Sequence, residues 1–341
     1  MHRLSLFVGI LVFTMSWVDD GRLQLWGQDV PETLRIGTWN LEWFYDHDKT
    51  DNRSKLSKEK SAPTKNDWQW KLNAVARVIG ETKPYIMAFQ EIENRKVLLD
   101  LKKVLHEKYR LSYRVAFVEG FDSFTGQDVG VLFQNGLVEM SRREQNQEQW
   151  QSKRFYNLSK HLFTRFEWGT GPNKESLVLV NLHLRASPEK EDLRIKQIKL
   201  VRQWIDEDIR RGRNIMVVGD LNTEHGFGKQ QDHSDIGCLR GLGDGDASND
   251  LVDLHGSLQD SNRATHLNGK QFDRILFSQS LMEDNRNHRD LVFVRGFVAK
   301  DLVVVGEVDK DGSRWENMYS IPKVDRDISD HYPVFGEFEF K

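Results

Sequence analysis

The chain has 341 residues, of which 38% are hydrophobic and 30% charged, and its formal net charge is −3. This composition allows a sizeable core, as one large domain or two ordinary ones. The charge excludes a strongly basic coat for nucleic acid and leaves a local basic cleft open. The one cysteine, Cys238, excludes an intrachain disulfide and a cysteine-based metal site, so the fold must rest on packing, to which 10 Trp and 19 Phe contribute.

The N-terminal segment has the pattern of an export signal. His2 and Arg3 precede an apolar run over residues 4–18, which has the length of a signal-peptide core and is short for a membrane span. We therefore expect residues 1–27 to be a signal peptide and the protein to be exported to the periplasm or the extracellular space. The alternatives are a retained N-terminal anchor and a misassigned start codon.

From residue 34 onward, apolar runs alternate with charged or helical segments. The runs predict strands at residues 34–41, 85–92, 113–118, 129–134, 177–184, 215–221, 272–277 and 334–340. Apolar stripes at helical spacing predict one helix that ends before Pro84 and another over residues 188–211. This order is typical of a layered α/β domain. No Pro-, Gly- or Ser-rich linker interrupts it, so residues 33–341 are expected to form one domain.

Polar segments between these elements predict loops, at residues 45–67, 140–153, 224–250 and 307–329. The first is expected to be a solvated surface insertion. The third is rich in Gly and Asp and could bind calcium by composition, but its spacing is not that of an EF-hand loop, so a solvated loop is favoured. Long loops near strand ends often shape substrate clefts.

The stretch 214–224, NIMVVGDLNTE, ends a buried-strand pattern abruptly in two polar side chains. Asp220 and Asn222 are two residues apart, so they point to the same side if the extended conformation continues. Open α/β sheets build sites in this way, by placing polar groups at the C-terminal ends of buried strands. On these residues alone, an equally good interpretation is that both only cap a turn.

Other predicted strand ends carry similar side chains. Each has a structural alternative, as a turn residue, a helix-start carboxylate, a packed histidine or a cap. Together they place carboxylates, amides and imidazoles at the edges of five strands, in GTWNLEWF, MAFQEIEN, LVLVNLHL, QFDRILFS and ISDHYPVFGEF. The residues are Asn40, Glu91, His183, Asp273, Asp330 and His331.

This set suits metal-assisted hydrolysis of a phosphoester. Glu91 and Asp330 offer the oxygen ligands that suit Mg²⁺ or Mn²⁺, which would neutralise the phosphate. His331 can take a proton from water near neutral pH, provided that a carboxylate such as Asp273 fixes its tautomer. Three further side chains can donate hydrogen bonds to the phosphoryl oxygens: His183, Asn40 and Asn222. No nucleophile-elbow or Walker motif competes with this interpretation.

The ordered blocks WN, QE, NLHL, GDLN, FDRI and SDHYP resemble those of the endonuclease/exonuclease/phosphatase superfamily. The resemblance spans roughly residues 34–341 and implies that residues 33–341 are a catalytic domain, a four-layer α/β/β/α sandwich of two packed mixed sheets flanked by helices. It also implies a role for each site residue: Asn40 and Glu91 as the amide and carboxylate at the metal, His183 as the phosphate-contacting histidine, Asp220 and Asn222 as the pair beside the attacking water, Asp273 as the residue that orients the base His331, and Asp330 as a second metal ligand.

Within that superfamily, the FDRI block and His183 are more similar to the deoxyribonuclease I-like branch. Two features depart from it. Glu93 takes the place of a basic residue that in that branch reaches into the DNA minor groove, and the cysteine pairs of secreted animal relatives are missing. Asp128, in GQDVGVLF, lies close to where the family places a second acidic or polar residue. Phosphodiester cleavage is therefore indicated more strongly than DNA as the substrate.

Three functions fit these observations. The first is an exported nuclease that uses Mg²⁺, with Mn²⁺ or Ca²⁺ as alternatives, and cuts DNA or RNA. The second applies the same chemistry to a phospholipid or a small phosphodiester, as in sphingomyelinase-like relatives; an exposed apolar loop would favour it, and none is evident between the strands. The third is a binding protein without catalysis, and no protein partner is indicated. For a nuclease, the expected substrate contacts are Arg95, Arg185, Asp128, Trp43 and Phe124.

These hypotheses share one geometric requirement. His331, His183 and Asp220 must converge on a single pocket, although they are far apart in the sequence. We also expect His331 and Asp220 to lie at an exposed strand edge, so that alanine at either position would leave folding intact.

Overall fold

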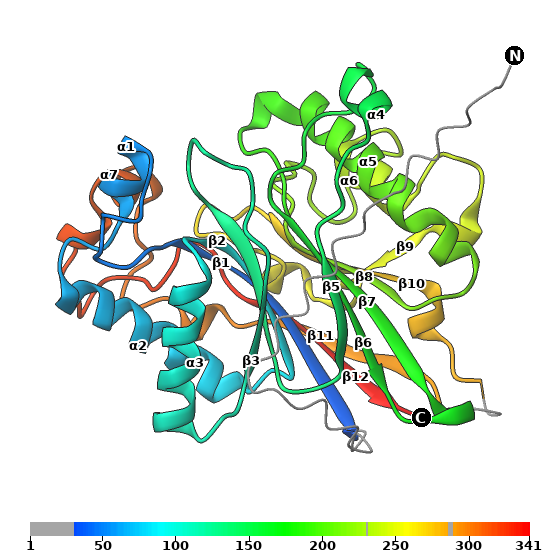
Figure 1. Cartoon of the computed structure of the whole chain (residues 1–341), viewed down its shortest axis with the longest axis horizontal. Coiled ribbons are helices and arrows are strands. Elements are labelled where there is room, and N and C mark those ends of the chain that lie inside the picture. The colour runs from blue at the N-terminus through cyan, green and yellow to red at the C-terminus, as the bar shows by residue number, and fades with distance from the viewer. Residues whose placement is uncertain (1–30, 230, 286–288) are drawn as a thin grey trace, which may run out of the picture.

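The computed structural model describes residues 31–229, 231–285 and 289–341, which form two six-stranded mixed sheets flanked by helices (Figure 1). The predicted signal peptide or anchor, residues 1–27, lies outside these residues. Within the described ranges, no helix is both long and apolar enough to cross a bilayer.

Each sheet has a parallel pair of strands at its centre, β1 with β2 and β7 with β8, and its other pairs are antiparallel. In spatial order, the first sheet contains β11 (Leu291–Val298), β12 (Val334–Phe340), β1 (Thr33–Phe44), β2 (Ile86–Ile92), β4 (Asp128–Phe133) and β3 (Arg114–Phe117). The second contains β5 (Leu137–Ser141), β6 (His161–Trp168), β7 (Glu175–His183), β8 (Ile215–Asp220), β10 (Asp273–Ser278) and β9 (Leu251–Asp253).

The core has three apolar parts, which separate four layers. The middle part lies between the sheets and joins residues such as Ile36 of β1 and Val218 of β8. Helices α2 (Lys65–Thr82) and α3 (Arg95–Tyr109) cover the outer face of the first sheet, and α5 (Glu191–Arg210) covers the second. The four-layer α/β/β/α sandwich implied by the resemblance is therefore confirmed. The remaining helices are α1 (Lys55–Lys60), α4 (Gln147–Gln151), α6 (Asp235–Arg240) and α7 (Asp311–Asn317).

Several elements escaped the sequence patterns. The strands β5, β6, β9 and β11 and the helix α3 were not predicted. β5, β9 and β11 are short or lie at a sheet edge, where charged and apolar residues mix and the apolar period is weak. The four segments predicted as loops contain the helices α1, α4, α6 and α7, so that prediction was wrong for part of each segment.

The segment 45–67 is also not a solvated insertion. Tyr45, Asp46 and Asn52 are buried in it. The buried carboxylate of Glu93 holds the segment, because it accepts hydrogen bonds from the Asp46 backbone N–H at 2.8 Å and from the Asn52 amide at 2.5 Å. Glu93 therefore supports a loop where the resemblance led us to look for a substrate contact.

Gly219 lets β8 reach the edge of its sheet. Its φ is +133°, and a Cβ there would lie 1.9 Å from the carbonyl oxygen of Leu182 on β7. We predict that Gly219→Ala lowers the free energy of unfolding by about 3 kcal/mol, because the strained backbone and the clash with a fixed strand act together. Urea unfolding would measure the loss.

The matched control is Gly212→Ala. Gly212 also has a positive φ, +72°, but nothing lies within 4 Å of a Cβ at that position. Only the backbone strain applies there, so the expected loss is about 1 kcal/mol. Equal losses in the two variants would contradict the steric argument.

Candidate active site

The faces of the two sheets that point toward each other change from apolar to polar at one edge. In β1, Leu34 and Ile36 belong to the core between the sheets, and Asn40 follows on the same face. In β8, Met216 and Val218 belong to that core, and Asp220 follows. Strand side chains alternate, so the period that buries the apolar residues also aims the polar ones between the sheets.

The chain topology explains why these polar residues meet. β1 is parallel to β2 in one sheet and β7 to β8 in the other, so within each sheet the two C-terminal ends lie at one edge, and antiparallel β10 begins beside the end of β8. The Asn40–Asp220 hydrogen bond shows that the two edges face each other. His183, Asp220 and Asp273 are direct register partners across β7, β8 and β10. Sheet pairing alone therefore brings three of the predicted site residues side by side.

Asp220 connects the two sheets. Its Oδ2 accepts a hydrogen bond of 2.9 Å from the Asn40 amide, which also donates to Glu91 Oε1 at 3.3 Å. Its Oδ1 accepts the backbone N–H of Asn222 at 2.9 Å, so Asp220 also stabilises a turn. Both interpretations of this residue thus apply, one to each oxygen.

Asn222 does not continue the strand. β8 ends at Asp220, and Asn222 has φ +49°, so the expectation of a continued extended conformation was wrong. Its amide donates to the Leu184 carbonyl at 3.2 Å. Asn222 remains next to Asp220 through the turn rather than through strand alternation.

Two imidazoles face the Asp220 carboxylate. His331 Nδ1 lies 2.7 Å from Asp273 Oδ2, and its Nε2 lies 3.8 Å from Asp220 Oδ2. His183 Nε2 lies 3.6 Å from the same Asp220 oxygen and 4.0 Å from Glu91 Oε1. The structure therefore brings His331, His183 and Asp220 into one cluster.

The two histidines differ in charge. Burial disfavours the charged form of His331, but the carboxylates of Asp273, Asp330 and Asp220 outweigh it and raise its pKa well above the ordinary value. Burial, and then the charge of Lys160, lowers the pKa of His183 to about 3. His183 is therefore a neutral hydrogen-bonding group near neutral pH.

Glu91 and Asp330 form a pair of carboxylates at the same edge. Burial, and then the charge of Asp330, raises the pKa of Glu91 to about 7. A divalent cation between the two would offset this repulsion. The carboxylate oxygens of Glu91 and Asp330 suit a hard ion such as Mg²⁺, Mn²⁺ or Ca²⁺. Asn40, the third predicted ligand, instead turns its amide nitrogen toward Glu91, and its side-chain oxygen accepts the Glu42 backbone N–H at 2.9 Å.

Backbone contacts fix the positions of these two carboxylates. Glu91 Oε2 accepts the Trp43 backbone N–H at 3.0 Å, and the Asp330 backbone N–H donates to Glu42 Oε2 at 3.1 Å. Glu42, Trp43 and Glu91 all have a positive φ, between +46° and +59°. Strain of this kind is common at functional sites.

Sequence reasoning missed His266. Its Nε2 lies 3.5 Å from Asp330 Oδ2, and its ring packs edge-on against His331 with centroids 4.6 Å apart. His266 Nδ1 accepts the Asn268 backbone N–H at 3.1 Å, which leaves the proton on Nε2, facing Asp330. A lone histidine outside any predicted strand gave no signal.

Lys160 was missed because β6 was not predicted. Its backbone oxygen accepts the His183 N–H at 3.1 Å, and its ammonium lies 3.1 Å from Asp122 Oδ2. The charge of Lys160 acts on both His183 and Glu91. Lys160 is therefore a basic group beside the cluster.

Three predicted substrate contacts make no hydrogen bond or ion pair with the cluster in the described part of the chain. Asp128 is buried, and its Oδ1 accepts the Gly120 N–H at 2.6 Å. Arg185 is exposed two residues after His183, and Arg95 is exposed at the first turn of α3. Of the three, Arg185 lies nearest to the cluster along the chain.

Two expectations about exposure were wrong. His331 and Asp220 are 6% and 2% exposed, because both sheets and the segment before β12 enclose the edge. Trp43 is 5% exposed and is not a surface residue, whereas Phe124 is exposed. Alanine at His331 or Asp220 therefore opens a buried site rather than trimming a surface.

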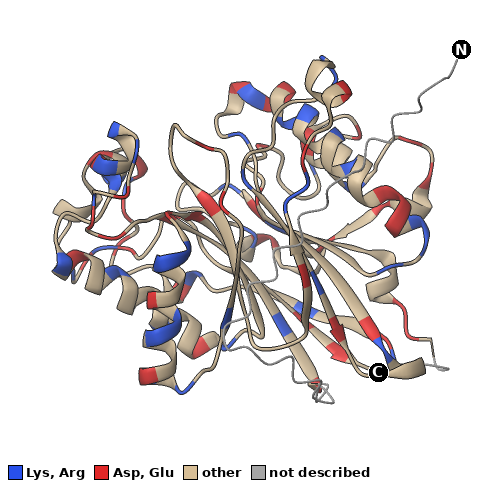
Figure 2. Cartoon of the chain, in the orientation of Figure 1, with Lys and Arg blue, Asp and Glu red and all other residues tan. Residues whose placement is uncertain are grey.

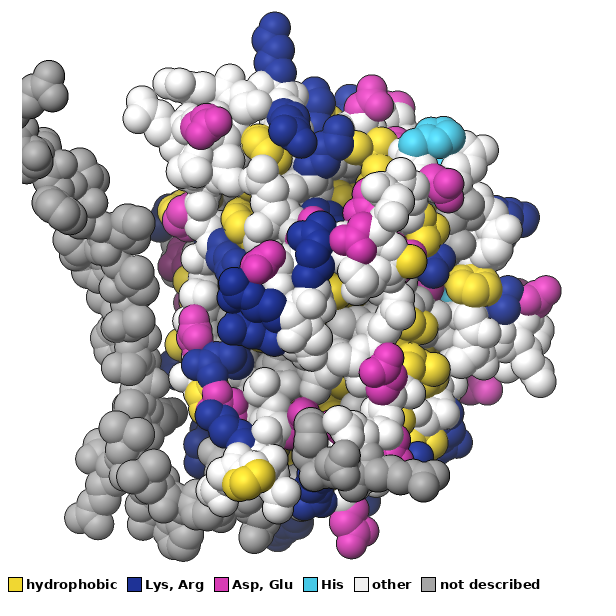
Figure 3. Space-filling view, turned by 90° about the vertical axis from the view of Figure 1, so that its right-hand side faces the viewer, with side chains coloured by type: hydrophobic (Ala, Val, Ile, Leu, Met, Phe, Trp, Pro, Cys, Tyr) yellow, Lys and Arg dark blue, Asp and Glu magenta, His cyan; other side chains and the backbone are white. Residues whose placement is uncertain are grey.

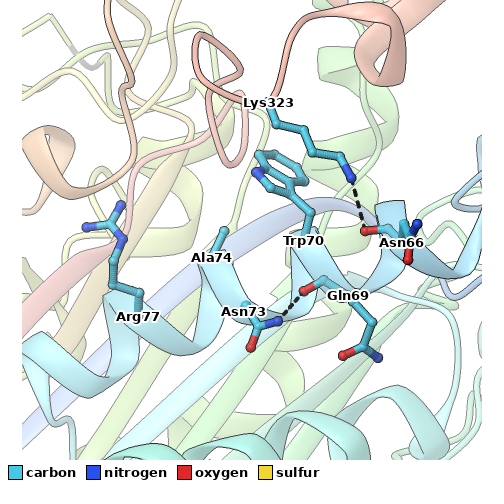
Figure 4. A pocket seen from close by; sticks show the side chains of 7 residues that line it. All are labelled: Asn66, Gln69, Trp70, Asn73, Ala74, Arg77 and Lys323. Atoms are coloured by element: carbon cyan, nitrogen blue, oxygen red, sulfur yellow. Dashed lines mark hydrogen bonds between the residues drawn. The ribbon is translucent and has the colours of Figure 1, made fainter.

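A shallow surface pocket of about 560 Å³ lies beside α2, away from the cluster (Figure 4). Lys323 reaches across it to the Asn66 carbonyl at 3.3 Å, next to the ring of Trp70. None of its lining residues belongs to the cluster.

Ser329 joins the last site segment to β1. Its buried hydroxyl donates to the Asn40 carbonyl at 2.8 Å and accepts the His331 backbone N–H at 3.1 Å. We predict that Ser329→Ala lowers the free energy of unfolding by about 1–3 kcal/mol, because two buried backbone groups lose a partner. The matched control is Ser313→Ala, an exposed serine that donates to the Lys310 carbonyl; it should change by less than about 0.5 kcal/mol. Equal unfolding midpoints for Ser329→Ala and wild type would show that the bridge is unimportant.

Comparisons with known proteins show the family and the fold. A family model described as Endonuclease/Exonuclease/phosphatase family matches residues 37–331. Similar solved structures include an endonuclease/exonuclease/phosphatase from Bacteroides vulgatus, with TM-score 0.56, 16% identity and 91% and 99% of the two chains covered. Others are D. rerio TDP2 complexed with single strand DNA product, with TM-score 0.53, 15% identity and 91% and 100% covered, and the human Nocturnin catalytic domain with bound sulfate anion, with TM-score 0.53, 14% identity and 92% and 96% covered. No curated protein matches the chain.

Proposed function

Because the chain belongs to the endonuclease/exonuclease/phosphatase family, whose members hydrolyse phosphoester bonds, we propose that it is a metal-dependent phosphodiesterase that cleaves nucleic acid. The observation that carries the proposal is the His331–Asp273 contact of 2.7 Å, with His331 Nε2 facing Asp220 and the Asn40 amide joining Asp220 to Glu91. The pattern of residues 1–27 supports export of the enzyme, which we retain as part of the proposal.

The catalytic base in this proposal is His331. His331 acts in its neutral form, in which Asp273 holds Nδ1–H and Nε2 accepts a proton from water, while Asp220 Oδ2, 3.8 Å from Nε2, orients that water. Neutral His183 can donate its Nε2–H to a phosphoryl oxygen without adding charge to the site. A cation held by Glu91 and Asp330 would neutralise the phosphate and oppose the effect of Asp330 on the His331 pKa.

Nucleic acid is the favoured substrate on one ground. The similar D. rerio TDP2 structure holds a single strand DNA product. The helices that cover the sheets carry mixed charges, and on the face in Figure 3 Lys and Arg side chains are interspersed with Asp and Glu (Figures 2 and 3). A broad basic coat therefore does not explain binding, and recognition must depend on groups close to the site.

A phospholipid substrate is the second candidate, and a specific observation favours it. Phe121 and Phe124, between β3 and β4, are 67% and 72% exposed, so the sequence-based view that no exposed apolar loop exists was wrong. The guanidinium of Arg142 lies 4.6 Å from the Phe121 ring centroid, a pairing that suits a stacked base as well as a membrane surface. Hydrolysis of phosphatidylcholine or sphingomyelin vesicles in preference to plasmid DNA and RNA would favour the second candidate over the first.

The His331–Asp273 mechanism predicts large rate losses. His331→Ala and Asp220→Asn should each lower kcat on single-stranded DNA with Mg²⁺ by about 10³-fold or more. His106→Ala, an exposed histidine of α3, is the control and should retain the wild-type rate. Circular dichroism must show a native fold in each variant, since His331 and Asp220 are buried. Wild-type turnover in either variant would remove the mechanism.

The assigned metal ligands predict a loss of binding that is independent of turnover. Mg²⁺ should raise the melting temperature of the wild-type protein, because the ion binds only the folded state. Glu91→Gln should need at least about 10-fold more Mg²⁺ for the same rise in melting temperature. The exposed control Glu107→Gln should behave like wild type. An unchanged titration in Glu91→Gln would show that the ligand is misplaced.

A further inference from the structure

A cavity of about 430 Å³ lies between α1 and α7, against the catalytic cluster; we call it the α1–α7 pocket. Two of its residues also support the site, since Glu42 accepts the Asp330 N–H and Trp43 donates to Glu91. The pocket is lined by Glu42, Trp43, Glu59, Lys60, Pro63, Asp67, Arg314, Trp315, Glu316, Asn317, Met318, Tyr319 and Ser320.

Aromatic side chains form much of the pocket wall. The rings of Trp43 and Trp315 are tilted toward each other, with centroids 6.0 Å apart, and Tyr45 packs edge-on against Trp43 at 5.4 Å. Glu42 and Trp43 have φ of +46° and +54°, a conformation that costs free energy for residues other than glycine. Two such residues in succession hold the Trp43 indole at the wall between the pocket and Glu91.

Two polar atoms of this wall have no hydrogen-bond partner in the described part of the chain. They are the indole Nε1 of Trp43 and the hydroxyl of Tyr319. Trp43 is only 5% exposed. A buried N–H or O–H without a partner costs free energy, so it is a sign of a missing partner. A ligand that reaches either atom would supply the missing partner.

Most of the ionic groups of the pocket are neutralised within the protein. Arg314 lies 2.7 Å from Glu42, and ion pairs of 3.5 Å join Asp67 to Lys323 and Glu59 to Lys55. A site for a quaternary ammonium needs uncompensated negative charge beside the aromatic rings. Here the Lys60 ammonium, 3.7 Å from the Trp315 ring centroid, already places a positive charge at the ring and disfavours a second cation.

Lys60 also connects the pocket to the catalytic carboxylates. Burial lowers the pKa of its ammonium, while the charges of Glu42, Glu91 and Asp330 act in the opposite direction. The geometric link is Trp43, whose ring lies 6.0 Å from that of Trp315 and whose backbone N–H donates to Glu91 at 3.0 Å, so the pocket adjoins a carboxylate of the catalytic cluster. A lysine beside an aromatic face is the usual combination for a nucleotide, because the cation meets the phosphate and the ring stacks on the base.

We propose that the α1–α7 pocket binds the nucleobase next to the scissile phosphate, by stacking on Trp315 and by accepting a hydrogen bond from Trp43 Nε1. This inference rests on the proposed function and narrows its substrate to nucleic acid with an unstacked base, as in single strands and frayed ends. A neutral, planar, hydrogen-bonding group fits the walls better than a charged head group. The stacked base displaces the Lys60 ammonium toward the phosphate.

The test uses thymidylyl-thymidine, which has a single phosphodiester, and two analogues that each lack one base. With wild-type protein and Mg²⁺, removal of one of the two bases should lower kcat/KM about 10-fold, and removal of the other should have less than about a 2-fold effect. Trp315→Ala should lower kcat/KM on the intact dinucleotide by the same factor. On the analogue whose missing base matters, Trp315→Ala and wild-type protein should have the same kcat/KM. Trp150→Ala is the control, because Trp150 is 58% exposed on α4, on the other side of the molecule in Figure 1.

A binding measurement separates this inference from the proposed function. By calorimetry, wild-type protein should bind thymidine monophosphate at least about 5-fold more tightly than deoxyribose 5-phosphate, and Trp315→Ala should bind both equally. If the dinucleotides are not cleaved but this difference is present, the proposed function fails and the pocket assignment stands. Equal binding of both ligands by the wild type, a base effect that survives Trp315→Ala, or tighter Trp315-dependent binding of phosphocholine would each overturn the inference.

Discussion

The hydrogen bond between Asn40 and Asp220 is the contact on which the site depends. It joins the central strand of one sheet to the central strand of the other, across 180 positions of sequence. Below it, Gln90 donates to Asn181 at 2.6 Å, and Asn181 donates to the Phe89 and Gly130 carbonyls. These buried amides set the relative position of the sheets, because a slip by one residue would leave them without partners and turn the site residues away.

The features of the site that cost folding free energy lie at the same edge. Four non-glycine residues with positive φ lie there or next to it, and they share the edge with several buried carboxylates; the residues are Glu42, Trp43, Glu91 and Asn222. The large apolar core between and outside the sheets supplies the stability that this arrangement uses. A site that holds several like charges together is suited to bind a divalent cation, which is why metal binding and catalysis are coupled in the proposed function.

The two sheets provide the chemistry, and the segments between them provide the selectivity that we infer. Residues of the segment 45–63 and of the segment that contains α7 line the α1–α7 pocket. Buried carboxylates order both segments, since Glu93 holds the backbone at Asp46 and Asp327 accepts the N–H groups of Val305 and Asp309 at 2.7 and 2.9 Å. Charge-rich sequence therefore forms a rigid pocket wall here, because its acidic groups bind backbone rather than water.

The sequence by itself determined the family, the layered architecture, most central strands and the polar residues at their ends. These follow from local patterns, since a buried strand has a strong apolar period and an ordered series of short motifs is specific. Tertiary structure decided the rest. His266, Lys160 and the pocket walls belong to elements with weak periods, and their neighbours in space are distant in sequence. Asp220 Oδ1 stabilises a turn, which a local pattern can suggest. Its Oδ2 accepts the Asn40 amide from the opposite sheet, and no local pattern contains that contact.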